Sequence, residues 1–119
     1  MIFEDIIQNV VDDIKGCWSG IMMGTDGVMV ASYKNESEDD DVTTISIEFA
    51  NILRNICQSS EHLETGQVEE ITIKTEKMIY LVRMINDEYF IALILKPFGN
   101  YGKARYLIKK SIRDFLEEL

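Results

Sequence analysis

The sequence predicts one three-layer α/β/α domain of the α+β class, in which a five-stranded antiparallel sheet carries helices on both faces. Three observations predict it. The chain has 119 residues, which is enough for a single domain with one core over residues 1–119. Hydrophobic residues make up 46% and charged residues 28% of it, as in globular proteins. Helical and strand-like apolar spacings alternate in the order α-β-β-α-β-β-β-α.

The first half of the predicted sheet follows a short helix. Residues 2–15 place apolar side chains three and four positions apart, which predicts an amphipathic helix. Strands are predicted at 18–24 and 28–33, and Asp26-Gly27 between them is a strong hairpin signal. Both strands are apolar at consecutive positions, so we expect both faces of each strand to be covered.

A long helix is predicted at 43–63, after an acidic loop at 34–41. The aspartates Asp39, Asp40 and Asp41 precede it, where negative charge stabilises the positive end of the helix dipole. Its main apolar stripe consists of Ile45, Phe49, Ile52, Leu53, Ile56 and Leu63. A second, mixed face holds Ile47, Ala50, Arg54 and Cys57. Two partly apolar faces on one helix indicate a contact surface besides the core.

The second half of the sheet is predicted from three strands, at 68–75, 78–85 and 89–95, with a final helix at 101–119. Asn100 is the expected N-cap of this helix. The strand at 68–75 is half polar, with isoleucines facing one side and Glu70, Thr72 and Lys74 the other. This pattern is typical of a sheet edge, which must be paired or protected.

The charge balance excludes some partners. Twelve Lys and Arg stand against twenty-one Asp and Glu, so the net charge is −9. Nucleic acids and anionic membranes bind clustered positive charge, so neither is an expected partner. No apolar run approaches the roughly 18 residues of a transmembrane helix, and the acidic N-terminus is unlike a signal peptide. We therefore expect a cytoplasmic protein with reduced thiols.

We predict no catalytic residue, no cofactor and no metal site. His62, the one histidine, has no convergent partners and is expected at the surface end of the long helix. Cys17 and Cys57 have apolar or acidic surroundings that do not stabilise a thiolate, so they should act as buried apolar residues. The acidic loop lacks EF-hand spacing, and the glycines at 20–27 lie in a hairpin rather than a phosphate-binding loop.

Two segments carry a family resemblance. Residues 23–31 look like a "G-x-D-G-hydrophobic-x-hydrophobic-A" hairpin, and residues 93–105 look like a strand end followed by an "N-hydrophobic-G" turn and a helix start. With the element order, they resemble the roadblock / dynein light chain family over nearly the whole chain. The prokaryotic members similar to mutual gliding-motility protein B are the most alike in size and style.

The resemblance implies a homodimer in which the strand after the long helix pairs with its own copy and the two long helices pack side by side. It also implies that the helix face docks a Ras-like small GTPase. In the mutual gliding proteins the dimer accelerates GTP hydrolysis by stabilising the GTPase's own switch, and it donates no arginine finger. This implies a non-enzymatic regulator whose GTPase-activating effect acts through the partner's active site.

Candidate residues follow from this picture. The polar residues off the main stripe of the long helix are the expected GTPase-docking face: Glu48, Asn51, Arg54, Asn55 and Gln58. The expected dimer interface is Ile47, Cys57, Glu70, Ile71, Thr72, Ile73 and Lys74. A two-fold axis near Thr72 would place Glu70 opposite Lys74 of the other chain, and opposite charges across strands stabilise by roughly 0.2–1 kcal/mol.

Other interpretations remain open. One is an adaptor or scaffold, like a light chain, that binds a GTPase or motor without altering turnover. Another is a PAS-type small-molecule sensor, which normally has several short helices where this sequence predicts one unbroken helix at 43–63. Arg54 could reach a γ-phosphate as a finger. A structural or partner contact, including a pair with an acid on its own helix, is the favoured role.

Overall fold

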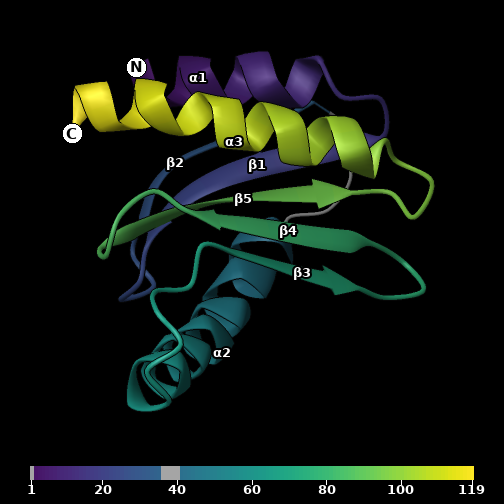
Figure 1. Ribbon diagram of the computed structural model, residues 1–119. Helices are drawn as coiled ribbons and strands as arrows, with labels where there is room; N and C mark the ends of the chain where they lie inside the picture. The colour runs from purple at the N-terminus through teal and green to yellow at the C-terminus, as the bar shows by residue number, and fades with distance from the viewer. Residues whose placement is uncertain (1, 36–40) are drawn as a thin grey trace.

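Three helices and five strands follow one another in the predicted order in the computed structural model, which describes residues 2–35 and 41–119 (Figure 1). They are α1 (Ile2–Asp12), β1 (Cys17–Gly24), β2 (Met29–Lys34), α2 (Asp41–His62), β3 (Glu70–Lys74), β4 (Ile79–Met84), β5 (Tyr89–Leu95) and α3 (Tyr101–Glu118). The predicted fold class is confirmed. The acidic-loop residues 36–40, including Asp39 and Asp40, lie outside the described residues.

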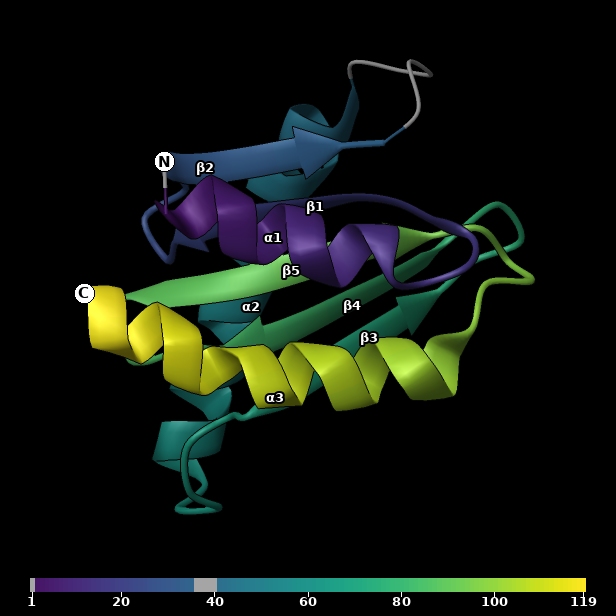
Figure 2. The ribbon, with the colours of Figure 1, turned by 90° about the horizontal axis from the view of Figure 1, so that it is seen from above.

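The strands form one antiparallel sheet in the order β2-β1-β5-β4-β3. Helices α1 and α3 cover one face of this sheet, and α2 lies on the other (Figure 1). Seen from above, α2 crosses beneath the strands, and its C-terminal end extends beyond the β3 edge (Figure 2). Among the described elements, two helices therefore cover one face of the sheet, and a single helix crosses the other.

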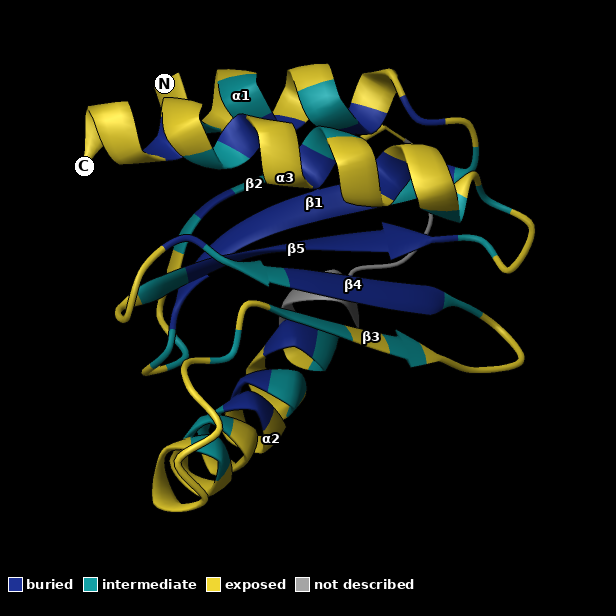
Figure 3. Cartoon of the chain, viewed as in Figure 1, coloured by how far each residue is buried: buried dark blue, intermediate teal, exposed yellow. Residues whose placement is uncertain are grey.

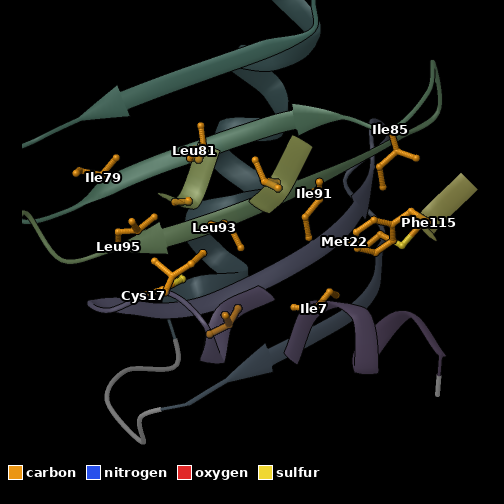
Figure 4. Close-up of a cluster of buried hydrophobic side chains, with 14 of the residues drawn as sticks. Ile7, Cys17, Met22, Ile79, Leu81, Ile85, Ile91, Leu93, Leu95 and Phe115 are labelled. Carbon is orange, nitrogen blue, oxygen red and sulfur yellow. The ribbon is translucent and has the colours of Figure 1, made fainter. Parts of the chain in front are cut away.

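Alternation along the central strand β5 divides the core in two. Successive side chains of a strand point to opposite faces. Leu93 and its neighbours two positions away pack under α1 and α3 with Ile7 and Phe115 (Figure 4). Phe90, Ala92 and Ile94 pack on the α2 side. Because each face has its own cluster, the three central strands are buried on both sides, as their near-continuous apolar runs predict.

The two edges of the sheet differ from each other. The predicted edge position of β3 is confirmed, since its only neighbour in the sheet is β4. The expectation that both faces of the strand at 28–33 are covered is wrong. In β2 only Ala31 is buried, and Met29 is 46% exposed. The strand is the opposite edge of the sheet, and consecutive apolar residues do not by themselves distinguish an edge strand from a central one.

The face of α2 that meets the sheet includes only half of the predicted stripe: Leu53 is buried there, and Ile45 and Phe49 pack partly buried against the same cluster. Ser46, Ala50 and Leu53 are buried there, at spacings of four and three. Three members of the predicted stripe remain uncovered: Ile52, Ile56 and Leu63 are 45%, 38% and 69% exposed. Small residues at 46 and 50 let the helix approach the sheet closely, and the larger isoleucines turn away about one quarter of the helix circumference from that line.

The helix α3 begins as predicted. The side chain of Asn100 accepts a hydrogen bond from the Lys103 N–H at 3.1 Å, which satisfies one of the unpaired donors of the first turn. The helix then buries Ala104, Ile108, Ser111 and Phe115 against α1 and the sheet. Phe3 of α1 stacks on Phe115 with 6.2 Å between ring centroids, so α1 and α3 form one layer.

Gly20 lets α1 lie directly on β1, and this contact gives a test of the fold. A Cβ at Gly20 would lie 2.7 Å from Cγ2 of Ile7 and 3.0 Å from Cγ2 of Val11, and both are β-branched side chains with little rotamer freedom. Gly20→Ala should lower the free energy of unfolding by about 1–3 kcal/mol, measured by urea titration.

The matched control is Gly102→Ala, because a Cβ there meets only Asn100 Oδ1, at 4.0 Å. It lies in α3, where alanine is the better helix former, so it should leave stability unchanged or raise it by up to about 1 kcal/mol. Equal effects of the two variants would contradict the described packing of α1 on β1.

Candidate protein-docking site

The outer side of α2 carries the five residues predicted as a docking face. Glu48, Asn51, Asn55 and Gln58 are exposed at spacings of three, four and three, so they lie along one side of the helix. Arg54 lies beside them and is half-buried. The structure therefore brings the five residues onto one continuous surface, and Figure 3 shows the exposed positions along α2.

The guanidinium of Arg54 is held against the β1–β2 turn. It donates to the backbone carbonyl of Thr25 and to Oδ1 of Asn51. Asp26 Oδ1 accepts from the Val28 N–H at 3.1 Å and shapes the same turn. The expected pair with an acid on its own helix is not what Arg54 forms. Its contacts join the middle of α2 to the hairpin that carries the first family motif.

An apolar stripe on α2 is exposed beside this polar face. It consists of Ile52, Ile56 and Leu63, which we call the α2 stripe. The helical spacing in the sequence predicts these residues as part of the core stripe, but the fold leaves them uncovered. Ile47, predicted for the dimer interface, lies on the other flank of the helix by its 3.6-residue period. Cys57, predicted there too, follows Leu53 by four residues and packs against the core cluster on the α2 side of the sheet. Ile47 is 43% exposed, whereas Cys57 is half-buried.

The free edge of β3 presents unpaired backbone groups. Met84 N–H donates to Glu69 O at 3.0 Å, and Thr75 N–H donates to Met78 O at 2.8 Å, at the two ends of the β3–β4 ladder. Along an antiparallel pair, residues whose backbone N–H and C=O point toward the partner strand alternate with residues whose N–H and C=O point away from it. The N–H and C=O groups of Glu70, Thr72 and Lys74 therefore point away from β4.

The side chains of the same residues reach toward α3. Glu70 accepts from Arg105 at 2.7 and 3.0 Å, and it lies 3.9 Å from Arg83. The Thr72 hydroxyl lies 2.9 Å from the hydroxyl of Tyr101. Ile71 and Ile73 face the α2 side and are half-buried. The polar and apolar sides of β3 are thus arranged as the sequence pattern predicts.

A cleft of about 790 Å³ lies between the C-terminal half of α2, the loop at 66–69 and the β4–β5 turn. Its lining mixes Arg54 and Arg83 with Glu61, Glu69 and Asp87. Over residues 2–35 and 41–119, His, Cys, Asp and Glu form no group of three that could hold a metal ion.

Neither thiol is activated. Burial raises the pKa of Cys17 to about 12, and burial also raises the pKa of the half-buried Cys57. His62 is exposed at the end of α2, where the sequence placed it. The three glycines near the β1–β2 turn lie in or beside a hairpin. Within the described part of the chain, no helix is both long and apolar enough to cross a bilayer.

The structure is a three-layer α/β/α domain with an open strand edge and an exposed helix face. No protein-family model and no curated protein matches the chain, but solved structures do. MglC from Myxococcus xanthus is similar over 100% of both chains, with 32% sequence identity and a TM-score of 0.73.

Two further structures share the fold at low identity. Myxococcus xanthus MglB is 13% identical with a TM-score of 0.84, over 98% of this chain and 95% of that one. A Roadblock/LC7 domain from Streptomyces avermitilis is 12% identical with a TM-score of 0.80, over 96% and 97%. The chain belongs to the roadblock / dynein light chain (roadblock/LC7) family. This membership, with the unbroken helix α2, leaves the PAS-type sensor interpretation without support.

The two cysteines should differ in their reactivity toward iodoacetamide. Cys17 is 2% exposed, so its alkylation should be limited by unfolding. Cys57 should react first, but slowly at neutral pH, because its raised pKa keeps it protonated; its rate should rise as the pH is raised above the ordinary thiol pKa. Mass spectrometry of peptides over time measures both rates.

The denatured chain is the control for this experiment, because both thiols are then exposed and should react at similar rates. Native-state alkylation of Cys17 as fast as that of Cys57 would contradict the burial of β1 beneath α1 and α3.

Proposed function

We propose that the chain forms a homodimer that binds a Ras-like small GTPase and stimulates its GTP hydrolysis by holding the GTPase's switch in the hydrolytic arrangement. The dimer itself is not an enzyme and supplies no arginine finger. The observation that carries the proposal is an unpaired strand edge together with an uncovered apolar stripe and a polar face on α2, the helix whose C-terminal end extends beyond that edge (Figure 2).

The β3 edge supports pairing with a second copy. A two-fold axis through Thr72 would pair Thr72 with itself and Glu70 with Lys74 of the other chain. All three residues direct their backbone groups outward, so this register joins donors to acceptors along the whole strand. Glu70 already accepts from Arg105, so we expect Lys74 to add only the few tenths of a kcal/mol typical of exposed pairs.

The α2 stripe supports the same axis. Ile52, Ile56 and Leu63 are separated by four and seven residues, a spacing found where two helices meet along a seam. A two-fold axis brings one patch against its own copy, so each stripe would cover the other. The stripe therefore replaces Ile47 and Cys57 as the proposed helix contact, while Glu70, Ile71, Thr72, Ile73 and Lys74 remain the proposed strand contact.

The polar face of α2 is the proposed GTPase-docking surface. When the stripes meet, Glu48, Asn51, Asn55 and Gln58 of both helices are left outside the seam. The guanidinium of Arg54 is occupied by Thr25 and Asn51, which supports a positioning role rather than a catalytic one. The catalytic atoms would then all belong to the GTPase.

The dimer is tested with charged substitutions on the two flanks of α2. Ile56→Asp should convert a species of twice 13.7 kDa to one of 13.7 kDa in light scattering over a dilution series, because it places a charge in the proposed seam. Ile47→Asp, on the other flank and similarly exposed, is the matched control and should leave the dimer intact.

Lys74→Glu should weaken the dimer by no more than about fivefold, since it alters one exposed pair at each end of the strand. Dissociation by Ile47→Asp but not by Ile56→Asp would contradict the proposed seam and favour the opposite flank.

GTP hydrolysis is tested in single turnovers with Ras-like small GTPases from the source organism. The wild-type chain should accelerate hydrolysis, and Arg54→Ala should keep the acceleration within about threefold, whereas loss of a true arginine finger costs about 10³–10⁵. Glu48→Arg combined with Asn55→Arg should weaken binding by about tenfold or more, because both lie at the proposed docking face.

Binding without any change in turnover would instead establish the adaptor or scaffold interpretation. Loss of acceleration by a factor of about a thousand or more in Arg54→Ala would overturn the proposed mechanism.

A further inference from the structure

The positive charge of this acidic chain is concentrated on α3. Residues 101–113 contain five basic side chains and no acidic one: Lys103, Arg105, Lys109, Lys110 and Arg113. Because the whole chain carries −9 and this segment carries +5, the remaining residues carry −14. Asp114, Glu117 and Glu118 follow in the last turns, so α3 as a whole carries +2 and the rest of the chain −11, which is the opposite sign.

Three of the five basic residues lie on the flank of α3 that faces β3 and the end of β4. Arg105 reaches Glu70 of β3, while Lys109 and Arg113 line a groove of about 610 Å³ with Arg83 of β4. Figure 2 shows α3 lying over this edge of the sheet. The residues that line it, which we call the α3 groove, are Arg83, Met84, Lys109, Ile112, Arg113, Leu116 and Glu117.

The α3 groove combines an apolar surface with positive charge. Ile112 is half-buried in it and Leu116 is 46% exposed, whereas the side chain of Met84 packs with the cluster on the α2 side of the sheet. Spacings of three and four residues place side chains on one side of a helix. Lys109, Ile112, Arg113 and Leu116 have such spacings. This arrangement presents an apolar strip with cations along it to any segment that lies in the groove.

The acidic groups nearby neutralise only part of this charge. The side chain of Glu70 is 17% exposed and is held by Arg105 and Arg83. Glu117 also lines the groove and lies 3.8 Å from Arg113. The four basic residues Arg83, Arg105, Lys109 and Arg113 less these two acids leave a charge of +2. Among the described residues, Lys109 has no side-chain partner. The groove therefore retains net positive charge.

We propose that the α3 groove binds an acidic, amphipathic helical segment of a partner protein, at a site distinct from the α2 face. Apolar side chains of that segment would contact Ile112 and Leu116, and its carboxylates would pair with Arg83, Lys109 and Arg113. Helical segments bind in this way by placing their apolar face in a groove, with flanking charges setting the orientation. The −14 carried by the rest of the chain disfavours an anionic membrane as the occupant.

The homodimer proposed above would carry two such grooves on the face opposite α2. Each groove lies level with Glu70, so an axis at Thr72 would place the two grooves at opposite ends of the β3 junction. The single-chain groove exists without the dimer, so the two proposals fail separately.

The test uses the full chain and a fluorescent amphipathic peptide in which leucines at spacings of three and four form one face and glutamates fill the other positions. The full chain should bind it at low ionic strength in fluorescence anisotropy. Lys109→Glu with Arg113→Glu should weaken binding by about tenfold or more, because two attractions become repulsions.

The matched control is Lys103→Glu with Lys110→Glu, which makes the same change in net charge on the other flank of the same helix. It should weaken binding by no more than about twofold if the α3 groove is the site. A scrambled peptide of the same composition, with its leucines on no single face, should bind more weakly than the amphipathic one. Thermal melting should show that both charge-reversal variants are folded.

Equal weakening by the two double variants, or no binding at about millimolar peptide, would overturn the proposal. Binding of phosphatidylserine vesicles in place of the peptide, lost in Lys109→Glu with Arg113→Glu, would also overturn it in favour of a membrane site. Stimulation of GTP hydrolysis should survive these substitutions, because they lie on the opposite face of the sheet from α2.

Discussion

The unpaired backbone groups along β3 are the constraint on which the account of this domain depends. Glu70, Thr72 and Lys74 direct their N–H and C=O groups away from the sheet, where only water or another strand can satisfy them. The α2 stripe is uncovered on the neighbouring face. The proposed two-fold contact with a second copy would satisfy the unpaired backbone groups of β3 and would also cover the α2 stripe. The polar α2 face and the α3 groove would then lie on opposite faces of the same continuous sheet.

Much of the fold follows from the sequence because its signals are local. Apolar spacing and hairpin turns predict the element order, and the half-polar pattern at Glu70, Thr72 and Lys74 predicts an edge strand. Which face of α2 is buried cannot be predicted from such local signals. Side-chain hydrophobicity predicts that Ile52 and Ile56 face the core. Ser46 and Ala50 are buried against the sheet, because their small side chains let the helix approach it closely. Which line of a helix meets a sheet is decided by packing that no single segment encodes.

In the candidate sites, too, the features set by local spacing are predictable from the sequence, and those set by tertiary packing are not. The docking face on α2 is predictable, because helical spacing alone places its residues on one side. The contact of Arg54 with the Thr25 carbonyl joins residues 29 positions apart, so it depends on the tertiary fold. The α3 groove is concealed by the net charge of −9, which averages over a basic helix and an acidic remainder. Only the topology brings Arg83 beside Lys109 and Arg113.

Backbone amide exchange along β3, measured by NMR over a concentration series, tests the central claim most directly. The N–H groups of Ile71 and Ile73 face β4 and should exchange slowly at every concentration at which the domain is folded. The N–H groups of Glu70, Thr72 and Lys74 should become equally slow only at concentrations at which the chain is dimeric. Fast exchange of these three amides in the dimer would contradict strand pairing across the two-fold axis. Protection that persists in a folded monomer would contradict it as well.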